Sequence, residues 1–289
     1  MADYEVYRAR ADVQRAETLA ATTSPFTIEV RFLGGLNQAQ QGAFTSAADR
    51  WTRIIVGDLP DVLVDGEVID DLVILAQGVV IDGPGKILGQ AGPTHVRPEA
   101  AGAAALLPVK GIMSFDTADL ASMEADGSLN DVIAHEMGHV LGLGTIWDLK
   151  GLLKDAGTDN PVVVGEGAMS EFGILQDGDP GPVPVENTGG PGTRDGHWRE
   201  SVFRNELMTG FVAQQGNPLS RMTAASFGDL GYQVDLDAAE AYELPDLFSL
   251  AVEGLLVAHS APIDVGIVLP IIPIVLPSGS LETSSGVPS

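Results

Sequence analysis

HEMGHVLGLGTIW, residues 135–147, places two histidines and a glutamate within little more than one helical turn. At about 100° per residue, His135 and His139 lie about 40° apart on one helix face, and Glu136 lies at the edge of that face. The opposite face is apolar and predicts a helix that packs on a sheet. Both imidazoles then face one point, where each can bind a zinc ion at about 2.1 Å.

The limits of this helix are also indicated by the sequence. Ser128 or Asn130 is suited to its N-cap, and Gly142 is suited to the left-handed position that ends it. The alternative is an ordinary helix with two buried histidines, because a five-residue motif recurs by accident. The helix pattern, the glycine stop and a methionine-containing segment downstream all agree, which favours a metal site.

Two histidines do not complete a catalytic zinc site, which needs three protein ligands and an open position for water. The commonest form of this motif has a third histidine three residues after Gly142, where this chain has Thr145. The chain has no cysteine, so the third ligand is a histidine or a carboxylate. The candidates are His95, His197 and His259, with Glu200 and Glu206 as competitors.

His197 is the favoured third ligand. Gly192 and Gly196 free the backbone just before it, and a structured segment with a methionine follows. His95 lies in a proline-flanked segment that predicts a surface loop, and His259 lies in a C-terminal tail without an evident scaffold.

Composition limits the classes of partner. The chain has 289 residues, 45% of them hydrophobic, which is enough for a sizeable core. A net charge of −25 repels phosphate and so disfavours nucleic acids and anionic membranes. The most apolar run, VGIVLPIIPIVLP at 265–277, is short and broken by prolines, so no stable membrane span is expected. The N-terminus lacks the apolar core of a secretory signal, so we favour secretion without a cleavable N-terminal signal, with a cytoplasmic location as the alternative.

The histidine motif is followed by two further segments, His197 in GHWRE and Met208 in NELMTG. Together they resemble the metzincin clan of zinc peptidases and, within it, the leishmanolysin family and its bacterial relatives. In that family a large insertion displaces the third histidine, and a methionine turn follows it. The resemblance spans roughly residues 25–235 and includes FTIEVRFLGGL, DLVILAQG and GIMSFD.

The resemblance implies an α+β fold of the metzincin zincin type. A twisted mixed β-sheet would form the upper subdomain, followed by the active-site helix and a smaller, mostly irregular and helical lower subdomain. The implied organisation is an N-terminal arm (1–24), the upper subdomain (25–144), a Gly-, Pro- and acid-rich insertion (145–196), the lower subdomain (197–245) and a C-terminal tail (246–289).

The resemblance also implies a role for each matched residue. Zinc would be bound by His135, His139 and His197, Glu136 would be catalytic, Met208 would form the hydrophobic floor below the metal, and Gly142 would turn the chain between subdomains. The chain is expected to be a monomeric zinc endopeptidase that acts on proteins or peptides. An inactive or latent zincin with structural zinc, acting as a binding module, is the alternative, and a non-peptide amide substrate is a third possibility.

Substrate and calcium binding are further expectations. Peptidases of this type add the substrate as an extended strand to a sheet edge. KILGQAG, followed by Pro93, is the candidate edge, with Leu88, Gly89 and Gln90 as substrate-binding residues; an ordinary surface strand is the alternative. Acids of the insertion can bind calcium or form a solvated loop. They are Asp155, Asp159, Glu166, Glu171, Asp177, Asp179, Glu186 and Asp195.

Overall fold

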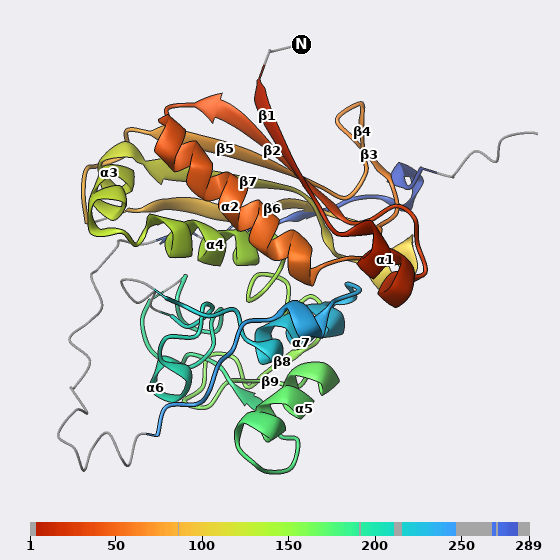
Figure 1. Ribbon diagram of the computed structural model, residues 1–289, viewed down its shortest axis with the longest axis vertical. Helices are drawn as coiled ribbons and strands as arrows, with labels where there is room; N and C mark the ends of the chain where they lie inside the picture. Colours follow the sequence, from red (N-terminus) through yellow and green to blue (C-terminus); the bar gives the residue numbers. More distant parts are fainter. Residues whose placement is uncertain are drawn as a thin grey trace, which may run out of the picture.

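A computed structural model provides the fold. The structure describes residues 4–85, 87–190, 192–210, 216–246, 268–269 and 271–282. Figure 1 shows a twisted sheet with helices along one face, and below them a smaller region of short helices and loops.

The upper part is built on a mixed β-sheet with the strand order β1-β2-β5-β7-β6, extended at the β6 edge by two short strands from the C-terminal tail. The three central strands are parallel, whereas β1 runs antiparallel to β2 and β6 runs antiparallel to β7. The bounds are β1 (Glu5–Arg10), β2 (Thr27–Gly34), β5 (Leu72–Val79), β6 (Gly89–Val96), β7 (Pro108–Asp116), β11 (Val268–Leu269) and β12 (Ile274–Val275).

Helices α2 (Gln38–Ile54) and α4 (Leu129–Val140) cover one face of this sheet, and α3 (Thr117–Asp126) lies at its end (Figure 1). A reciprocal capping box starts α2, with hydrogen bonds between Asn37 and Gln40. The helix α4 lies very close to β7, because a Cβ at Gly111 would be 2.4 Å from a methyl carbon of Val140. A glycine in the central sheet therefore sets the depth at which α4 sits.

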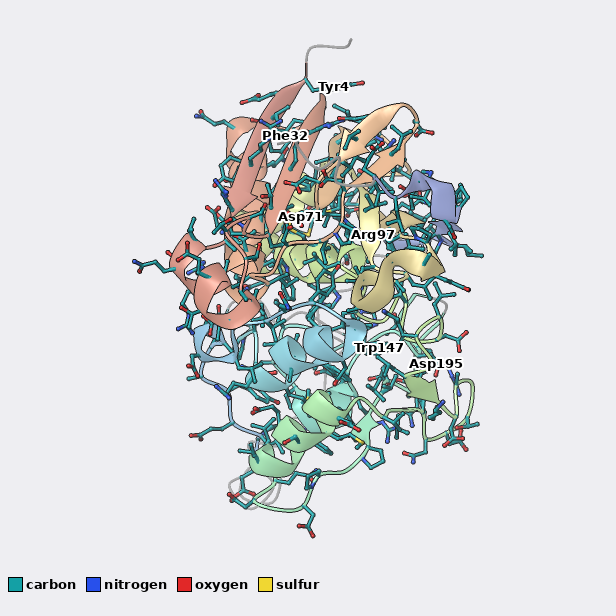
Figure 2. All side chains as sticks on the ribbon, turned by 90° about the vertical axis from the view of Figure 1, so that its right-hand side faces the viewer. Tyr4, Phe32, Asp71, Arg97, Trp147 and Asp195 are labelled. Carbon is teal, nitrogen blue, oxygen red and sulfur yellow. The ribbon has the colours of Figure 1, made fainter. Side chains whose placement is uncertain are left out.

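The other face of the sheet is covered by the hairpin of β3 (Val62–Val64) and β4 (Glu67–Ile69). Its apolar side chains pack against Val73 and Val109 of the sheet. Arg97, which follows β6, is fully buried and donates hydrogen bonds to four backbone carbonyls, including that of Asp71. Figure 2 labels Asp71 and Arg97 in the upper part, and the hydrogen bonds of Arg97 tie the end of β6 to the segments on either side of the hairpin.

The described residues of the lower part form three short α-helices and a small three-stranded sheet. The helices are α5 (Glu166–Leu175), α6 (Glu200–Phe203) and α7 (Arg221–Leu230), and the strands are β8 (Leu153–Lys154), β9 (Val162–Val163) and β10 (Val183–Pro184). The remaining elements are α1 (Val13–Ala20), η1 (Glu99–Ala104), η2 (Leu236–Ala238) and η3 (Ser278–Ser280). The insertion predicted at 145–196 therefore contains regular secondary structure, including β8, α5 and β10.

The α+β arrangement with a mixed sheet agrees with the fold class expected from the sequence. No helix among the described residues is long and apolar enough to cross a membrane. One local prediction was wrong, because His95 lies within β6 and not in a loop. The segment expected as an N-terminal arm contains β1, which pairs with β2 of the sheet. In β6 the register shifts after Pro93, as expected for a proline on a strand interrupted by a bulge.

Candidate metal centre

Three histidine side chains converge where α4 faces the lower part. The Nε2 atoms of His135 and His139 are 3.0 Å apart, and that of His197 lies 3.0 Å from the first and 2.9 Å from the second. His135 and His139 project from successive turns of α4, and His197 comes from the segment that precedes α6. All three side chains are buried, so the fold holds three ring nitrogens at one shielded point.

The other ring nitrogen of each histidine is bonded to a backbone carbonyl. Nδ1 of His135, His139 and His197 lies 2.7, 2.8 and 2.8 Å from the oxygens of Leu207, Leu143 and Thr193, respectively. A carbonyl oxygen can only accept, so each Nδ1 carries the proton and each Nε2 presents a lone pair. Three lone pairs about 3 Å apart repel one another unless a cation lies between them, and three neutral imidazoles are a donor set that zinc prefers.

The protonation of these rings fits a metal site. Burial lowers the pKa of all three histidines to about 3, and the neighbouring histidine contributes in each case. The hydrogen bonds to the backbone carbonyls act in the opposite direction but do not offset the burial. The rings are therefore neutral at physiological pH, which is the form that binds metal.

Glu136 is the acidic group at the centre. It follows His135 directly on α4 and is buried, and its Oε2 atom has no hydrogen-bond partner among the described residues. Burial raises the pKa of this carboxyl group to about 8. A buried carboxylate without a partner is costly, and a cation nearby reduces that cost, so this orphaned oxygen also fits a metal centre.

Thr145 has a structural role in place of the missing ligand. Its hydroxyl donates to the carbonyl of His139 at 2.8 Å and so satisfies an oxygen at the end of α4. Gly142 and Gly144 have φ of +117° and +74°, which turn the chain away from the helix. A Cβ at Gly144 would lie 2.0 Å from the carbonyl oxygen of Gly196, so this turn rests directly on the backbone before His197.

The region that carries this geometry matches a known family. The family model of leishmanolysin matches residues 102–247, slightly more than half of the chain. The chain belongs to the leishmanolysin family. The resemblance to the leishmanolysin family is thereby confirmed over these residues, and the family places the chain among the metallopeptidases. A search of curated proteins found no match.

Met208, the residue expected as the methionine floor in this leishmanolysin-family chain, is fully buried beside α4. A Cβ at Gly138 would lie 2.7 Å from the sulfur of Met208 and 2.9 Å from the indole of Trp51. Trp51 in turn donates from Nε1 to the carbonyl of Ala134 at 2.8 Å. The glycine between the two histidines therefore lets a methionine from below and a tryptophan from α2 reach the same helix turn.

The other candidate ligands that the structure describes are not part of the histidine cluster. His95 is on β6, with Nδ1 3.1 Å from Thr94 Oγ1, and Glu200 and Glu206 are not in the converging group. His259 is outside the described residues. Among the residues that the structure describes, the groups of three or more potential ligands that converge are the histidines and Asp58, Asp70 and Asp71. The acids of the insertion are in neither group, so calcium binding there has no support in the structure.

The predicted substrate edge has a neighbour on both sides. Gly89 and Gln90 begin β6 and pair with β7, and their other side pairs with Val268 and Leu269 of the tail. Leu88 is buried just before the strand. The substrate-binding role of these three residues stays a prediction.

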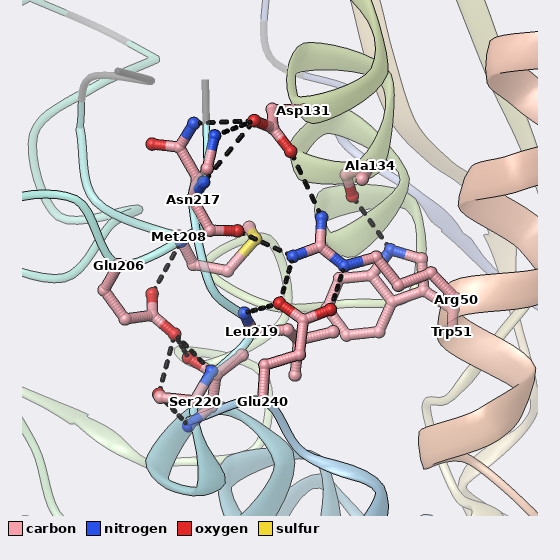
Figure 3. Close-up of polar contacts among 12 residues, drawn as sticks. Arg50, Trp51, Asp131, Ala134, Glu206, Met208, Asn217, Leu219, Ser220 and Glu240 are labelled. Atoms are coloured by element: carbon pink, nitrogen blue, oxygen red, sulfur yellow. Dashed lines mark hydrogen bonds and ion pairs between the residues drawn. The ribbon is translucent and has the colours of Figure 1, made fainter. Parts of the chain in front are cut away.

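Sequence reasoning did not find Arg50, which ties α2 and α4 to the lower part. Figure 3 shows its guanidinium between Asp131 on α4 and Glu240. It also donates to the carbonyl of Asn217 at 2.6 Å, while Asp131 accepts from the Asn217 amide at 3.0 Å. The signal in the sequence was weak, because an arginine on the polar side of a helix is usually a solvated residue.

The histidine cluster predicts metal content. Purified protein is expected to carry one zinc ion per chain by inductively coupled plasma mass spectrometry, and His197→Ala is expected to lose it, because two ligands remain. His95→Ala is the matched control, since this histidine lies outside the cluster. Full zinc occupancy in folded His197→Ala would contradict the assignment of this residue as the third ligand.

Substitution of Gly144 is expected to reduce the free energy of unfolding more than substitution of Gly151. Gly144 and Gly151 both have left-handed φ, +74° and +68°, but a Cβ at Gly151 meets nothing within 4 Å. Gly151→Ala should therefore cost only the backbone strain, about 1 kcal/mol. Gly144→Ala should cost roughly 1–3 kcal/mol more, because its methyl group collides with the Gly196 carbonyl. Urea unfolding of both variants checks this, and equal losses would show that the turn does not rest on Gly196.

Proposed function

We propose that this protein is a zinc endopeptidase that cleaves proteins or peptides. The observation that carries the proposal is the three-histidine cluster, which no fourth histidine, aspartate or glutamate of the described residues joins, beside a buried glutamate with an unpartnered oxygen. Three protein ligands with an open position are typical of catalytic zinc, whereas structural zinc usually has four. Family membership supports the same class of reaction.

His135, His139 and His197 would hold the zinc through Nε2, the atoms whose lone pairs the backbone carbonyls leave free. When bound, zinc supplies Lewis-acid chemistry, polarising a carbonyl and lowering the pKa of water. The bonds to Leu207, Leu143 and Thr193 hold the three rings in one orientation, so that little reorganisation accompanies the reaction.

Glu136 would act as the proton carrier. Its Oε2 atom accepts a proton from the attacking water and then delivers that proton to the leaving amine nitrogen of the cleaved peptide bond. The absence of a hydrogen bond to this oxygen from the described residues leaves it available for water and substrate. Burial around the site excludes bulk water, which strengthens the interaction of the carboxylate with the reacting atoms.

Met208 and the glycine turn would support this site from below. Met208 packs against Gly138, between the two α4 histidines, and would fill the space beneath them. Gly142 would turn the chain from the upper to the lower part, and Thr145 would hold that turn to the end of α4.

The alternative function is a binding module with structural zinc, and it differs in what Glu136 does. Glu136→Gln is expected to retain zinc while cleavage of unfolded casein falls by at least about 100-fold, because the amide cannot carry the proton. Glu17→Gln, a change at an exposed glutamate on α1, is the control and should cleave at the wild-type rate. Undiminished cleavage by Glu136→Gln would remove the proposed mechanism, and zinc-loaded wild type without hydrolytic activity would favour the binding module.

A further inference from the structure

Glu206 is a fully buried carboxylate with four hydrogen-bond donors around it. Its Oε2 atom accepts from the amide of Met208 at 2.6 Å. Its Oε1 atom accepts from the amide and the hydroxyl of Ser220, at 3.1 and 2.7 Å, and from the hydroxyl of Thr223 at 2.5 Å. Figure 3 shows Glu206 reaching from the segment before Met208 towards Ser220 at the start of α7.

The directions of these hydrogen bonds define the protonation of Glu206. The hydroxyl of Ser220 accepts from the amide of Thr223, and the hydroxyl of Thr223 accepts from the indole of Trp198. Each hydroxyl therefore turns its own hydrogen towards Glu206, and the two backbone amides can only donate. Four donors facing two oxygens leave no acceptor for a carboxyl proton, so Glu206 is ionised in this site.

The amide that meets Glu206 belongs to a peptide group that also meets a zinc ligand. The nitrogen of Met208 and the carbonyl oxygen of Leu207 are the two ends of one peptide group, and Leu207 O accepts from Nδ1 of His135 at 2.7 Å. Peptide resonance couples the two ends, so an anion bonded to the N–H increases the negative charge on the oxygen. A more negative acceptor makes the imidazole of His135 a stronger donor to metal at Nε2.

His197 provides an internal comparison. Its Nδ1 atom donates to the carbonyl of Thr193, and the N–H of that same peptide group, on Arg194, donates to the carbonyl of Gly190 at 3.2 Å. At His197 the position that Glu206 has at His135 is therefore taken by the neutral carbonyl oxygen of Gly190. His135 and His197 thus both donate from Nδ1 to a backbone carbonyl. They differ in the acceptor for the N–H of that peptide group, which is a carboxylate for His135 and a neutral carbonyl for His197.

We propose that Glu206 is a positioning residue that acts on His135 through the Leu207–Met208 peptide group and so strengthens zinc binding. The arrangement corresponds to a carboxylate–histidine–metal triad with a peptide group inserted between carboxylate and histidine. It depends on zinc binding by the three histidines and not on peptidase activity.

The test compares Glu206→Gln with Ser220→Ala in the full chain. Glu206→Gln removes the charge behind the peptide group, so the zinc dissociation constant, measured by competition with a chromophoric chelator, is expected to rise about 10-fold. The Nδ1–H proton resonance of His135 in the zinc-loaded, ¹⁵N-histidine-labelled protein should move upfield, while that of His197 stays in place. Ser220→Ala removes two hydrogen bonds made by that hydroxyl but keeps the bond from Glu206 to Met208.

Ser220→Ala should shift the His135 resonance slightly in the opposite direction, because fewer donors then share the carboxylate charge. A purely structural role would move the resonances of all three histidines in both variants, in step with lost stability. Unchanged zinc affinity and an unchanged His135 resonance in folded Glu206→Gln would overturn the proposal. If Glu206→Gln does not fold, the direction of the His135 shift in Ser220→Ala decides the question alone.

A second observation concerns the C-terminal tail, which lies along the outer edge of β6. Val268 and Leu269 pair with Gly89 and Gln90, and Ile274 and Val275 pair with His95 and Val96, in each case parallel to β6. Between these two pairings, a Cβ at Gly92 would lie 3.4 Å from Ile271, so the tail also covers the middle of the strand.

Residues 276–282, which follow β12, hold the tail to the upper part by further contacts. The amide of Leu276 donates to the carbonyl of Val96 at 3.1 Å, and the amide of Glu282 donates to that of Asp61 at 3.0 Å. Leu276 and Leu281 pack against the cluster of Val62, Val64, Ile69, Val73 and Val109 on the outer sheet face. The outer edge of β6 is therefore paired at both of its ends, at Gly89–Gln90 and His95–Val96, and β6 is the strand against which α4, with its two histidines, packs.

We infer that the tail is an internal competitor of the substrate: it occupies the backbone donors and acceptors that an extended peptide would use on β6. This rests on the proposed peptidase function, because a peptide that adds to a sheet edge needs unpaired backbone groups there. The tail would then keep the protein in a state of low substrate affinity until it is displaced.

The test frees the tail in the full chain and measures binding separately from cleavage. Leu276→Pro removes the amide that bonds to Val96 and the packing of this side chain. Ile272→Pro, at a side chain that is 92% exposed, is the matched control, and Leu281→Ser is a second variant at the other anchor. Fluorescein-labelled unfolded casein is titrated into each variant in an inactive Glu136→Gln background.

Leu276→Pro or Leu281→Ser is expected to bind casein at least about 10-fold more tightly than the control, since the energy of tail docking no longer competes. Hydrogen exchange at Gly89–Val96 should rise in the same variants and verify that the edge has been freed. Faster exchange without tighter binding would overturn the inference. Loss of the proposed function would look different, because zinc-loaded wild type would then fail to cleave casein at any concentration.

Discussion

The convergence of three imidazole lone pairs at one buried point is the constraint on which the rest of this structure depends. Nitrogen atoms 2.9–3.0 Å apart without an intervening hydrogen are repulsive, so the fold must hold the rings there by other bonds. It does so through three carbonyls from separate segments, those of Leu143, Thr193 and Leu207. The turn after α4 and the two segments on either side of His197 are thus each fixed by one ligand.

Three glycines allow the close packing that brings the histidines together. Gly111 brings α4 close to the sheet, Gly138 admits Met208 from the other side, and Gly144 lets the turn rest on the backbone of Gly196. A side chain at any of these positions would collide with the neighbouring atoms and so displace one histidine relative to the others. The close packing on both sides of α4 therefore also determines the relative positions of the three histidines.

The sequence predicted the parts of this site that depend on local periodicity. A four-residue spacing on an amphipathic helix places His135 and His139 together on one face of α4. It did not predict β1 or the tail strands, because an edge strand is defined by a partner far away in the sequence. For the same reason Arg50 and Glu206, whose partners lie on other elements, had no recognisable signature. At position 145 the sequence was only partly informative. The lack of a histidine there indicated that the third ligand lies elsewhere, but no local pattern predicted the hydrogen bond from Thr145 to the end of α4.

Two buried glutamates of the site differ in how completely the fold satisfies them. Glu206 receives four hydrogen bonds, whereas Oε2 of Glu136 receives none from the described residues. Burial raises the pKa of both carboxyl groups, but at Glu206 the surrounding donors act against that rise. A carboxylate saturated with donors is held as a fixed negative charge, while one without donors can exchange a proton with whatever enters the site. In the proposed mechanism the same residue type would therefore serve as a rigid support behind one metal ligand and as the reactive group in front of it, and the number of donors around each carboxylate makes the difference.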